Sequence, residues 1–235
     1  MKIGVIGTGR MGAGLGGLWA AAGHEVMFGS RDAGKAQDVA GSVGSGARGG
    51  SVEDAAAFGD VVLLAVPYGA AAATLEGLAE GGALTGKVVV DLTNPVAGNQ
   101  DGLGLGLAVW GTGSGGEEMA AAAPGALVVK AFNHIYSRVF SSASGRDFGP
   151  DGTDVATAFL CGDDEGAKST VGVLARDMGF EPVDIGPLSM ARCLEPFALL
   201  MIRLQFLPGM SADTAVKLLR HQVVAEQAVP TRAGG

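Results

Sequence analysis

The stretch KIGVIGTGRMG, residues 2–12, places three glycines directly after a short apolar run. Gly7, Gly9 and Gly12 have the spacing GxGxxG, and a helix-like segment follows them. The pattern predicts a strand, a tight turn and a helix N-terminus. We expect Gly7 to allow the turn, Gly9 to leave room for a pyrophosphate and Gly12 to let the helix lie close to the sheet. The stretch therefore predicts a dinucleotide-binding unit, with the phosphates at the helix N-terminus.

The end of the second predicted strand indicates which dinucleotide is preferred. NAD sites usually carry an acidic residue here, whereas an arginine suits the 2′-phosphate of NADP. This chain has GSRDAGK at residues 29–35, in which Ser30, Arg31 and Lys35 can converge on one phosphate. The alternative is a solvated loop in which Asp32 caps the next helix, and that cap is compatible with phosphate binding. The sequence predicts a preference for NADP(H).

Short apolar runs and helical segments alternate along the rest of the chain. Buried strands are expected at residues 61–66, 87–92, 127–131, 153–161 and 181–185. This alternation predicts an α/β fold, a Rossmann doubly wound and mostly parallel sheet. Two further helices, predicted at residues 189–207 and 211–228, indicate a small C-terminal helical domain. We therefore expect a dinucleotide-binding domain at residues 1–186 and a helical domain at residues 187–235.

Two glycine-rich segments interrupt this alternation. Residues 41–50 are expected to form a flexible loop, after which Ser51 and Asp54 open a short helix as a capping box. Residues 98–116 are compatible with a mobile lid, an ordered loop or an irregular strand. The sequence leaves these three alternatives open.

Composition and charge argue against several classes of function. The net charge of −8 over 235 residues argues against nucleic-acid binding, which rewards broad basic faces. The longest apolar stretch, residues 197–207, contains Arg203 and Gln205 and is too short to span a bilayer. We also expect no signal peptide before the first strand. These observations predict a cytoplasmic protein that binds neither nucleic acid nor a membrane.

Neither the cysteines nor the acidic residues have the pattern of a metal site. Cys161 and Cys193 lack metal-ligand spacing, so we expect buried thiols in a reducing compartment. Asp163, Asp164 and Glu165 form an acidic cluster, but such clusters at the start of a helix usually cap it and favour its dipole. We expect no metal site.

Ligands of a doubly wound sheet lie at the carboxyl ends of its strands. Val66, Pro67 and Tyr68 follow one buried run, so we expect them to border the cofactor. Pro67 is also a plain strand terminator. Asn94 and Pro95 follow the next run and are expected to form a second loop at the same edge.

Asn133 and His134 follow the strand predicted at residues 127–131. A histidine at this edge is a candidate proton donor or hydrogen-bond anchor, because its ordinary pKa lies near neutral pH. The alternative is a helix-capping asparagine beside a half-exposed histidine. The sequence does not decide between them.

Five short motifs occur together and in order along the chain. They are GTGRMG, the GSR tip, KAFN at 130–133, CGDD at 161–164 and GPLSMAR at 186–192. The set resembles the NADPH-dependent F420 reductase family, also called F420-dependent NADP oxidoreductases, over about residues 1–207. The resemblance implies a homodimer that moves a hydride between NADPH and the deazaflavin coenzyme F420, in a cleft between a Rossmann domain and a small helical domain. The cofactor residues that it implies are Thr8, Gly9, Arg10, Met11, Ser30, Arg31, Lys35, Val66 and Pro67.

Hydride transfer between two rings depends mainly on positioning and on the exclusion of water. We therefore expect Asn133 or His134 to hydrogen-bond the acceptor ring, and the apolar turn of Pro187, Leu188 and Met190 to wall the acceptor site. Two alternatives remain open. One is an NADPH-dependent reductase of another small molecule, such as a flavin, imine or carbonyl compound, and the other is an NADPH-sensing binding protein without turnover.

Overall fold

The computed structural model describes residues 1–98, 105–109, 111–142, 145–149, 151–207, 209–211 and 213–220. Its strands are β1 (Lys2–Ile6), β2 (Glu25–Gly29), β3 (Arg48–Gly50), β4 (Val61–Leu64), β5 (Val88–Asp91), β6 (Val96–Gly98), β7 (Leu105–Leu107), β8 (Leu127–Ala131), β9 (Thr157–Gly162) and β10 (Glu181–Asp184). Its helices are α1 (Arg10–Ala21), α2 (Ala33–Val43), α3 (Val52–Phe58), α4 (Tyr68–Glu80), α5 (Gly115–Ala122), α6 (Ser137–Ser142), α7 (Glu165–Asp177), the short 3-10 helix η1 (Leu188–Met190) and α8 (Ala191–Leu204).

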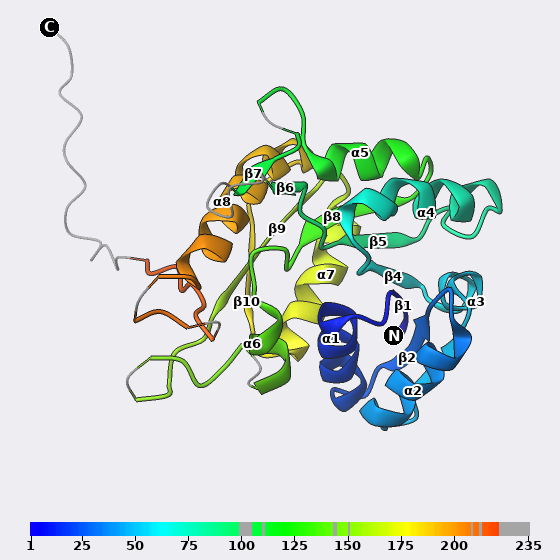
Figure 1. The fold of residues 1–235 in the computed structure, drawn as a ribbon, viewed down its shortest axis with the longest axis horizontal. Coiled ribbons are helices and arrows are strands. Elements are labelled where there is room, and N and C mark those ends of the chain that lie inside the picture. The colour runs from blue at the N-terminus through cyan, green and yellow to red at the C-terminus, as the bar shows by residue number, and fades with distance from the viewer. Residues whose placement is uncertain are drawn as a thin grey trace, which may run out of the picture.

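Eight of these strands form one central sheet, in the order β10-β9-β8-β5-β4-β1-β2-β3 (Figure 1). Every neighbouring pair is parallel except β8 and β9, which are antiparallel. Apolar cores lie on both faces: α1, α2 and α7 contribute to one, and α3, α4 and α5 to the other. The predicted α/β fold with a mostly parallel, doubly wound sheet is confirmed.

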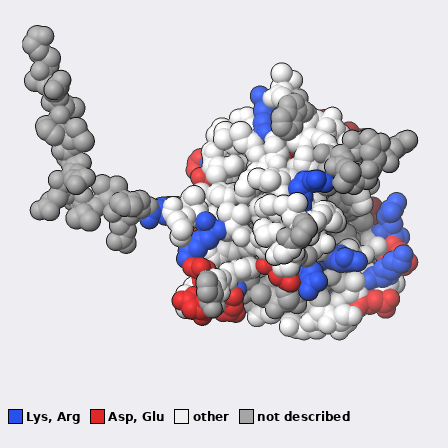
Figure 2. Space-filling model, turned by 60° about the vertical axis from the view of Figure 1, so that its left-hand side comes forward, with Lys and Arg blue, Asp and Glu red and all other residues white. Residues whose placement is uncertain are grey.

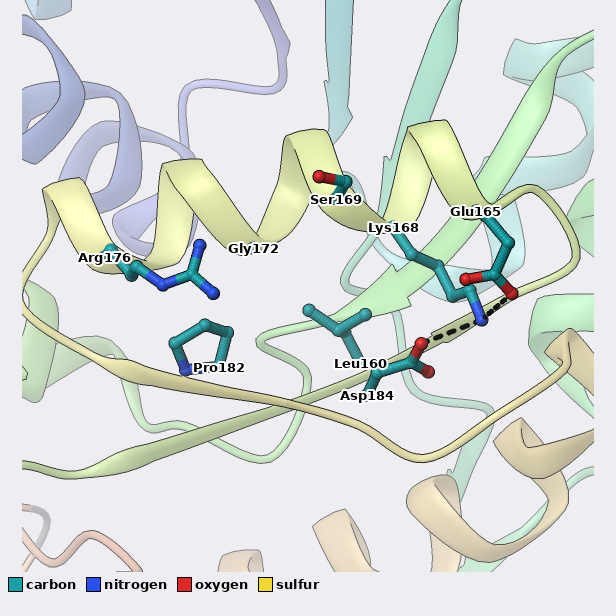
Figure 3. A pocket seen from close by; sticks show the side chains of 8 residues that line it. All are labelled: Leu160, Glu165, Lys168, Ser169, Gly172, Arg176, Pro182 and Asp184. Atoms are coloured by element: carbon teal, nitrogen blue, oxygen red, sulfur yellow. Dashed lines mark ion pairs between the residues drawn. The ribbon is translucent and has the colours of Figure 1, made fainter.

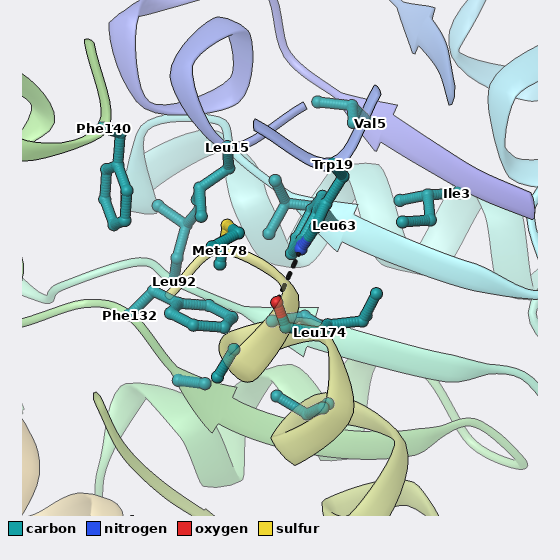
Figure 4. Close-up of a cluster of buried hydrophobic side chains, with 14 of the residues drawn as sticks. Ile3, Val5, Leu15, Trp19, Leu63, Leu92, Phe132, Phe140, Leu174 and Met178 are labelled. Atoms are coloured by element: carbon teal, nitrogen blue, oxygen red, sulfur yellow. Dashed lines mark hydrogen bonds between the residues drawn. The ribbon is translucent and has the colours of Figure 1, made fainter. Parts of the chain in front are cut away.

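Trp19 lies at the centre of the core under α1 (Figure 4). Its ring is fully buried, and its Nε1 donates a hydrogen bond of 3.1 Å to the carbonyl of Leu174. Phe132 meets it edge-on, with ring centroids 6.1 Å apart. The backbone of Phe132 has φ 62°, a left-handed conformation that bulky residues rarely adopt. The chain therefore turns sharply at the end of β8, just before Asn133.

Side-chain caps begin several helices where the sequence predicts them. Ser51 and Asp54 form the complete capping box of α3. Asp32 caps α2 by accepting hydrogen bonds from the amides of Gly34 and Lys35, and Asp164 caps α7. The capping interpretation of Asp164 is therefore confirmed.

The predicted flexible loop at residues 41–50 is wrong. Helix α2 continues to Val43, and Arg48–Gly50 form β3, the edge strand that pairs with β2. Gly49 packs so tightly against α2 that a Cβ there would lie 2.4 Å from the amide nitrogen of Gln37. Here glycine serves close packing of a strand against a helix rather than flexibility.

The C-terminal region agrees with the sequence only in part. The helix predicted at 189–207 is present as η1 followed by α8. The helix predicted at 211–228 is not formed in its described part, where the main chain of residues 216–218 bonds to Thr157 at the start of β9. Residues 221–235 lie outside the described residues, and the domain boundary at residue 187 stays a prediction.

Segment 98–116 is described only in part. Within it β7 pairs with β6 in an antiparallel hairpin, and Gly115 begins α5. Residues 99–104 and 110 lie outside the described residues, so a lid stays a prediction. None of the helices in the described ranges is long and apolar enough to cross a membrane.

Charged side chains are spread around the surface in the view of Figure 2. Lysines and arginines are separated there by uncharged or acidic residues rather than joined into one basic face. This distribution accords with the net charge of −8.

Candidate active-site cleft

The glycine turn between β1 and α1 has the geometry that the fingerprint predicts. Gly7 has φ 116°, and a Cβ there would lie 2.3 Å from the carbonyl oxygen of Ala65. A Cβ on Gly12 would lie 2.2 Å from the carbonyl oxygen of Gly7, so the helix packs directly on the turn. A Cβ on Gly9 would meet no protein atom within 4 Å. The turn therefore leaves open space at Gly9, next to the N-terminus of α1.

A cavity of about 240 Å³ lies at this turn, and we call it the glycine-turn cavity. Ser30 and Arg31 border it at the end of β2, and Val66 and Pro67 border it between β4 and α4. Arg31 is exposed and makes no ion pair with any residue that the structure describes. The other residues that line the glycine-turn cavity are Ile6, Gly7, Thr8, Gly9, Gly29, Val52, Ala65, Ala70 and Thr74.

A second cavity of about 480 Å³ adjoins the first, and we call it the asparagine cavity. Both cavities are lined by Gly9, Ala65, Val66 and Pro67, so they form one cleft along the carboxyl ends of the parallel strands. The asparagine cavity is mainly apolar. Its remaining lining residues are Arg10, Met11, Leu92, Asn94, Asn133, Ile135, Tyr136, Ser137 and Ile202.

Asn94 and Asn133 bond to each other across the floor of this cavity. Asn94 Nδ2 donates to the main-chain oxygen of Asn133 at 2.7 Å, and Asn133 Nδ2 donates to Asn94 Oδ1 at 2.9 Å. Asn133 is 5% exposed, and its Oδ1 is buried without a partner among the described residues. A buried acceptor normally has a donor. Asn133 lines the cleft, and its Oδ1 is an acceptor without a described partner.

His134 lies beside Asn133 in sequence, but its side chain does not line the cleft. Its ring packs between Phe159 and Phe197, with centroid distances of 5.4 and 5.7 Å. Its Nε2 lies 3.3 Å from the carbonyl oxygen of Thr157 and 3.4 Å from the amide of Phe159. Burial lowers the pKa of His134 to about 4, despite the opposing hydrogen bond to Thr157. This geometry does not support His134 as a proton donor in the cleft, and it equally excludes a half-exposed histidine.

Four of the predicted cofactor residues do not line either cavity. Tyr68 donates a hydrogen bond to Glu118 of α5, and burial and that bond raise its pKa. Lys35 is exposed and lies 3.9 Å from Asp32. Pro95 faces the start of α5, and Gly12 lies inside the glycine turn. The remaining predicted cofactor residues border one or both cavities.

The predicted acceptor wall of Pro187, Leu188 and Met190 lines neither cavity of the cleft. Asp163 holds this turn through a hydrogen bond of 2.8 Å from the amide of Leu188. The side chain of Leu188 packs toward the start of α5, where its Cδ1 would lie 3.6 Å from a Cβ on Gly116. Ile202, near the end of α8, lines the cleft instead. A role of the turn at the acceptor site stays a prediction.

A fully buried ionic cluster lies below the asparagine cavity and was missed at the sequence level. Lys130 Nζ lies 2.9 Å from Asp91 Oδ2 and 2.9 Å from Glu195 Oε1. Burial alone lowers the pKa of Lys130, but the two carboxylates more than offset this, so its pKa is raised. Each of these charges interrupts an apolar run in the sequence. Because charged residues are rarely buried without a partner, that interruption was the available signal.

A separate cavity of about 230 Å³ lies between α7 and strands β9 and β10 (Figure 3). Lys168 lines this cavity and forms two ion pairs there: its Nζ lies 2.7 Å from Glu165 Oε1 and 2.8 Å from Asp184 Oδ2. These partners raise the pKa of Lys168. No predicted site residue lines this cavity. Across the described residues, no group of three or more histidine, cysteine or acidic side chains is arranged to hold a metal ion.

Comparison with known proteins gives the same fold and a consistent set of relatives. The family model described as NADP oxidoreductase, coenzyme F420-dependent, matches residues 2–95. The F420-dependent NADP reductase of Methanothermobacter thermautotrophicus is 34% identical over 215 residues, covering 87% of this chain and 89% of that protein. Metalloreductase STEAP3 of Rattus norvegicus is 33% identical over 218 residues, covering 92% of this chain, but the chain spans only 39% of STEAP3. A crystal structure from Arthrobacter sp. FB24 has a TM-score of 0.81 at 29% identity, covering 94% of this chain and 100% of that chain.

Proposed function

The chain belongs to the family of coenzyme F420-dependent NADP oxidoreductases, and from this premise we propose that it transfers a hydride between NADPH and the deazaflavin coenzyme F420. The observation that carries the proposal is the pair of adjoining cavities. They share Gly9, Ala65, Val66 and Pro67. A dinucleotide bound at the glycine turn therefore extends toward the asparagine cavity, where a second ring has room.

The glycine-turn cavity suits the phosphates of NADP(H). The open space at Gly9 leaves room for a pyrophosphate at the N-terminus of α1, whose amides and dipole favour an anion. Ser30 and Arg31 stand at the end of β2, where the ribose of a dinucleotide is bound in this fold. Arg31 is exposed and free of ion pairs with described residues, so it can bind a 2′-phosphate. The positions of Ser30 and Arg31 therefore support binding of NADP(H) rather than NAD(H).

The asparagine cavity suits a flat, mainly apolar ring with polar edges. Leu92, Ile135 and Ile202 supply apolar surface, and Asn133 Oδ1 supplies a buried acceptor. NADPH supplies the hydride when bound. The apolar walls cover the reacting faces of the rings, and the asparagine pair orients the acceptor ring, which is the contribution that ring-to-ring hydride transfer requires.

Among the described residues that line the asparagine cavity there is no aspartate, glutamate, histidine or cysteine. We therefore propose that the proton taken up with the hydride comes from solvent rather than from a side-chain acid. The main contribution of the protein is then to position the acceptor ring. Asn133 is the residue that contacts the acceptor. His134 acts only as packing behind it.

The test mixes purified protein with NADPH and oxidised F420 and follows the visible absorption of the deazaflavin. We expect bleaching that depends on both the protein and NADPH. Folded protein that binds NADPH without bleaching F420 overturns the proposal. The similarity to metalloreductase STEAP3 then favours the second candidate, an NADPH-dependent reductase of another acceptor. Failure with every acceptor leaves an NADPH-binding protein without turnover.

We also propose a homodimer in the cytoplasm, with residues 187–235 as the helical domain that carries the contact. Large apolar side chains are exposed at the end of α8 and beyond, including Leu200 at 53% and Phe206 at 72%. Cys161 and Cys193 are free thiols, which accords with a reducing compartment; Cys161 is buried as expected, whereas Cys193 is exposed. Light scattering tests the dimer, and we expect Phe206→Glu to convert it to a monomer. A wild-type monomer at micromolar concentration contradicts this proposal.

A further inference from the structure

The buried cluster of Asp91, Lys130 and Glu195 is fully satisfied by hydrogen bonds. The ammonium of Lys130 contacts Asp91 Oδ2 at 2.9 Å, Glu195 Oε1 at 2.9 Å and the main-chain oxygen of Thr93 at 2.5 Å. Asp91 Oδ1 accepts from the amide of Thr93 at 2.8 Å. The ammonium therefore uses all three of its protons.

The second carboxylate is held by the start of α5. The amides of Gly115 and Gly116 donate to Glu195 Oε2 at 3.0 Å and to Glu195 Oε1 at 2.9 Å. First-turn amides have no partner inside their own helix, and the helix dipole favours an anion there. The excess negative charge of two carboxylates around one ammonium is thereby compensated by protein groups.

The three members of the cluster come from three elements, and each element leads to one wall of the asparagine cavity. Asp91 ends β5, and Asn94 follows three residues later. Lys130 lies in β8, and Asn133 follows three residues later. Glu195 lies in α8, and Ile202 follows two turns later on the same face.

Short stretches of chain link the cluster to the cavity. Lys130 is three residues before Asn133, with the left-handed turn at Phe132 between them. Seven helical residues from Glu195 to Ile202 span about 10 Å. Because the cluster joins β8 to α8, it restricts where Ile202 stands relative to Asn133.

We propose that Asp91, Lys130 and Glu195 form a positioning clamp that sets the places of Asn94, Asn133 and Ile202 around the asparagine cavity, and thereby the affinity for the hydride acceptor. The inference rests on the proposed function in one respect, namely that the acceptor occupies this cavity. None of the three residues lines the glycine-turn cavity. We therefore expect the clamp to act mainly on acceptor binding, and much less on NADPH, whose phosphates bind at the glycine turn.

The main test is Glu195→Gln, which keeps the shape of the side chain but removes its charge and one acceptor. Its matched control is Arg192→Gln, which removes the exposed ion pair of 2.5 Å between Arg192 and Glu117. That pair joins the same two helices, α8 and α5, but lies outside the clamp. Both variants are assayed for the NADPH dissociation constant, for kcat and KM with F420, and for hydrogen exchange of α8.

For Glu195→Gln we expect the KM for F420 to rise about tenfold or more, the NADPH dissociation constant to stay within about twofold, and the α8 amides to exchange about tenfold faster. For Arg192→Gln we expect no change in KM. Equal losses for F420 and NADPH, or faster exchange with an unchanged KM, overturn the clamp as a positioning device. If wild-type protein does not reduce F420, the proposed function fails, and the exchange of α8 alone decides whether the clamp holds that helix.

A second measurement needs no substitution and covers the case in which Glu195→Gln does not fold. Native-state exchange, followed by NMR on the wild-type chain, compares the amides of Gly115 and Gly116 with those in the middle of α8. We expect both glycine amides to be protected as strongly as Ala198, and to lose protection together with it as denaturant is added. Fast exchange at Gly115 and Gly116, as in an ordinary first helical turn, overturns the proposal.

Discussion

Asn94 and Asn133 join the ends of two neighbouring strands by a reciprocal pair of hydrogen bonds. Asn94 Nδ2 donates to the main chain of Asn133 at 2.7 Å, and Asn133 Nδ2 returns a bond of 2.9 Å to Asn94 Oδ1. The pair also determines which atom of Asn133 remains free. Because Nδ2 donates to Asn94, Oδ1 is the atom of Asn133 that has no described partner.

We predict that Asn133→Ala lowers kcat/KM for the acceptor about 10- to 100-fold, because it removes the free acceptor and leaves Asn94 Oδ1 without its donor. NADPH binding at the glycine turn should change far less. The comparison is His134→Gln, whose side chain is placed among Phe159, Phe197 and the Thr157 carbonyl rather than in the cleft. Steady-state kinetics at pH 7.5 measure both. A larger loss in His134→Gln than in Asn133→Ala would contradict the placement of these side chains.

Arg31→Ala should weaken NADPH binding about 30-fold or more and leave NADH binding within about twofold, since a charge-assisted bond to the 2′-phosphate is worth about 2–3 kcal/mol. Lys35→Ala is the matched control, because Lys35 is also exposed and cationic but does not line the cavity. We expect a much smaller effect from it. Fluorescence titrations with both nucleotides provide the dissociation constants, and equal losses for NADPH and NADH in Arg31→Ala would refute the phosphate contact.

Gly9→Ala should abolish most NADPH affinity without lowering stability. A Cβ at Gly9 meets no protein atom, and Gly9 has φ −75°, which alanine adopts freely. The added methyl group would therefore occupy only the space expected for the pyrophosphate. We expect a loss of affinity of about tenfold or more. Calorimetry and thermal unfolding measure the two quantities.

Two other glycines serve as controls for this substitution. Gly77→Ala in α4 also meets open space, but it lies away from the cleft, so affinity should be unchanged. Gly12→Ala would place a methyl group 2.2 Å from the Gly7 carbonyl oxygen, and we expect it to lower the melting temperature. Normal NADPH affinity in Gly9→Ala would show that the pyrophosphate does not bind at this turn.

His134 should make the protein less stable as the pH falls. Its pKa is about 4 when folded, below the ordinary value of 6.5. Between these values the unfolded chain binds a proton that the folded chain does not, so the contribution of His134 to stability is present above about pH 6.5 and is lost as the pH falls toward 4. The loss is on the order of 3 kcal/mol at pH 4.

Urea unfolding of the wild type and of His134→Gln, at several pH values between 7 and 4, measures this contribution. The carboxylates are common to both proteins, so the difference between the two curves reports on His134. We expect a shallower decline in the variant. Identical pH dependence in both proteins would show that His134 is not buried in its neutral form.

Local signals in the sequence were sufficient for the fold class and for half of the cleft. Gly7 is needed for its φ of 116° and Gly12 for its close approach to the Gly7 carbonyl, both within one strand-turn-helix unit. Asp32, Ser51 and Asp164 cap helices that begin next to them. Each of these effects acts over a few residues. They can therefore be recognised from spacing alone.

Other expectations failed where distant segments determine the outcome. Residues 41–50 look flexible by composition, but pairing of β3 with β2 and close packing of Gly49 on α2 order them. The turn at Pro187 follows a strand, as ligand-binding loops do. Its residues line neither cavity, because Leu188 is held by Asp163 and packs toward the start of α5.

The sequence by itself determined the glycine turn, the helix caps and the α/β alternation, because backbone sterics and capping depend on near neighbours in the chain. Only the tertiary structure decided that Asn133 lines the cleft while His134 is buried, that Ile202 rather than Leu188 lines the asparagine cavity, and that Lys130 joins Asp91 to Glu195. These relations depend on strand direction, on the left-handed turn at Phe132 and on the packing of α8. Some of these relations bring together groups that lie far apart along the chain. Another, that between Asn133 and His134, points two neighbouring side chains in different directions.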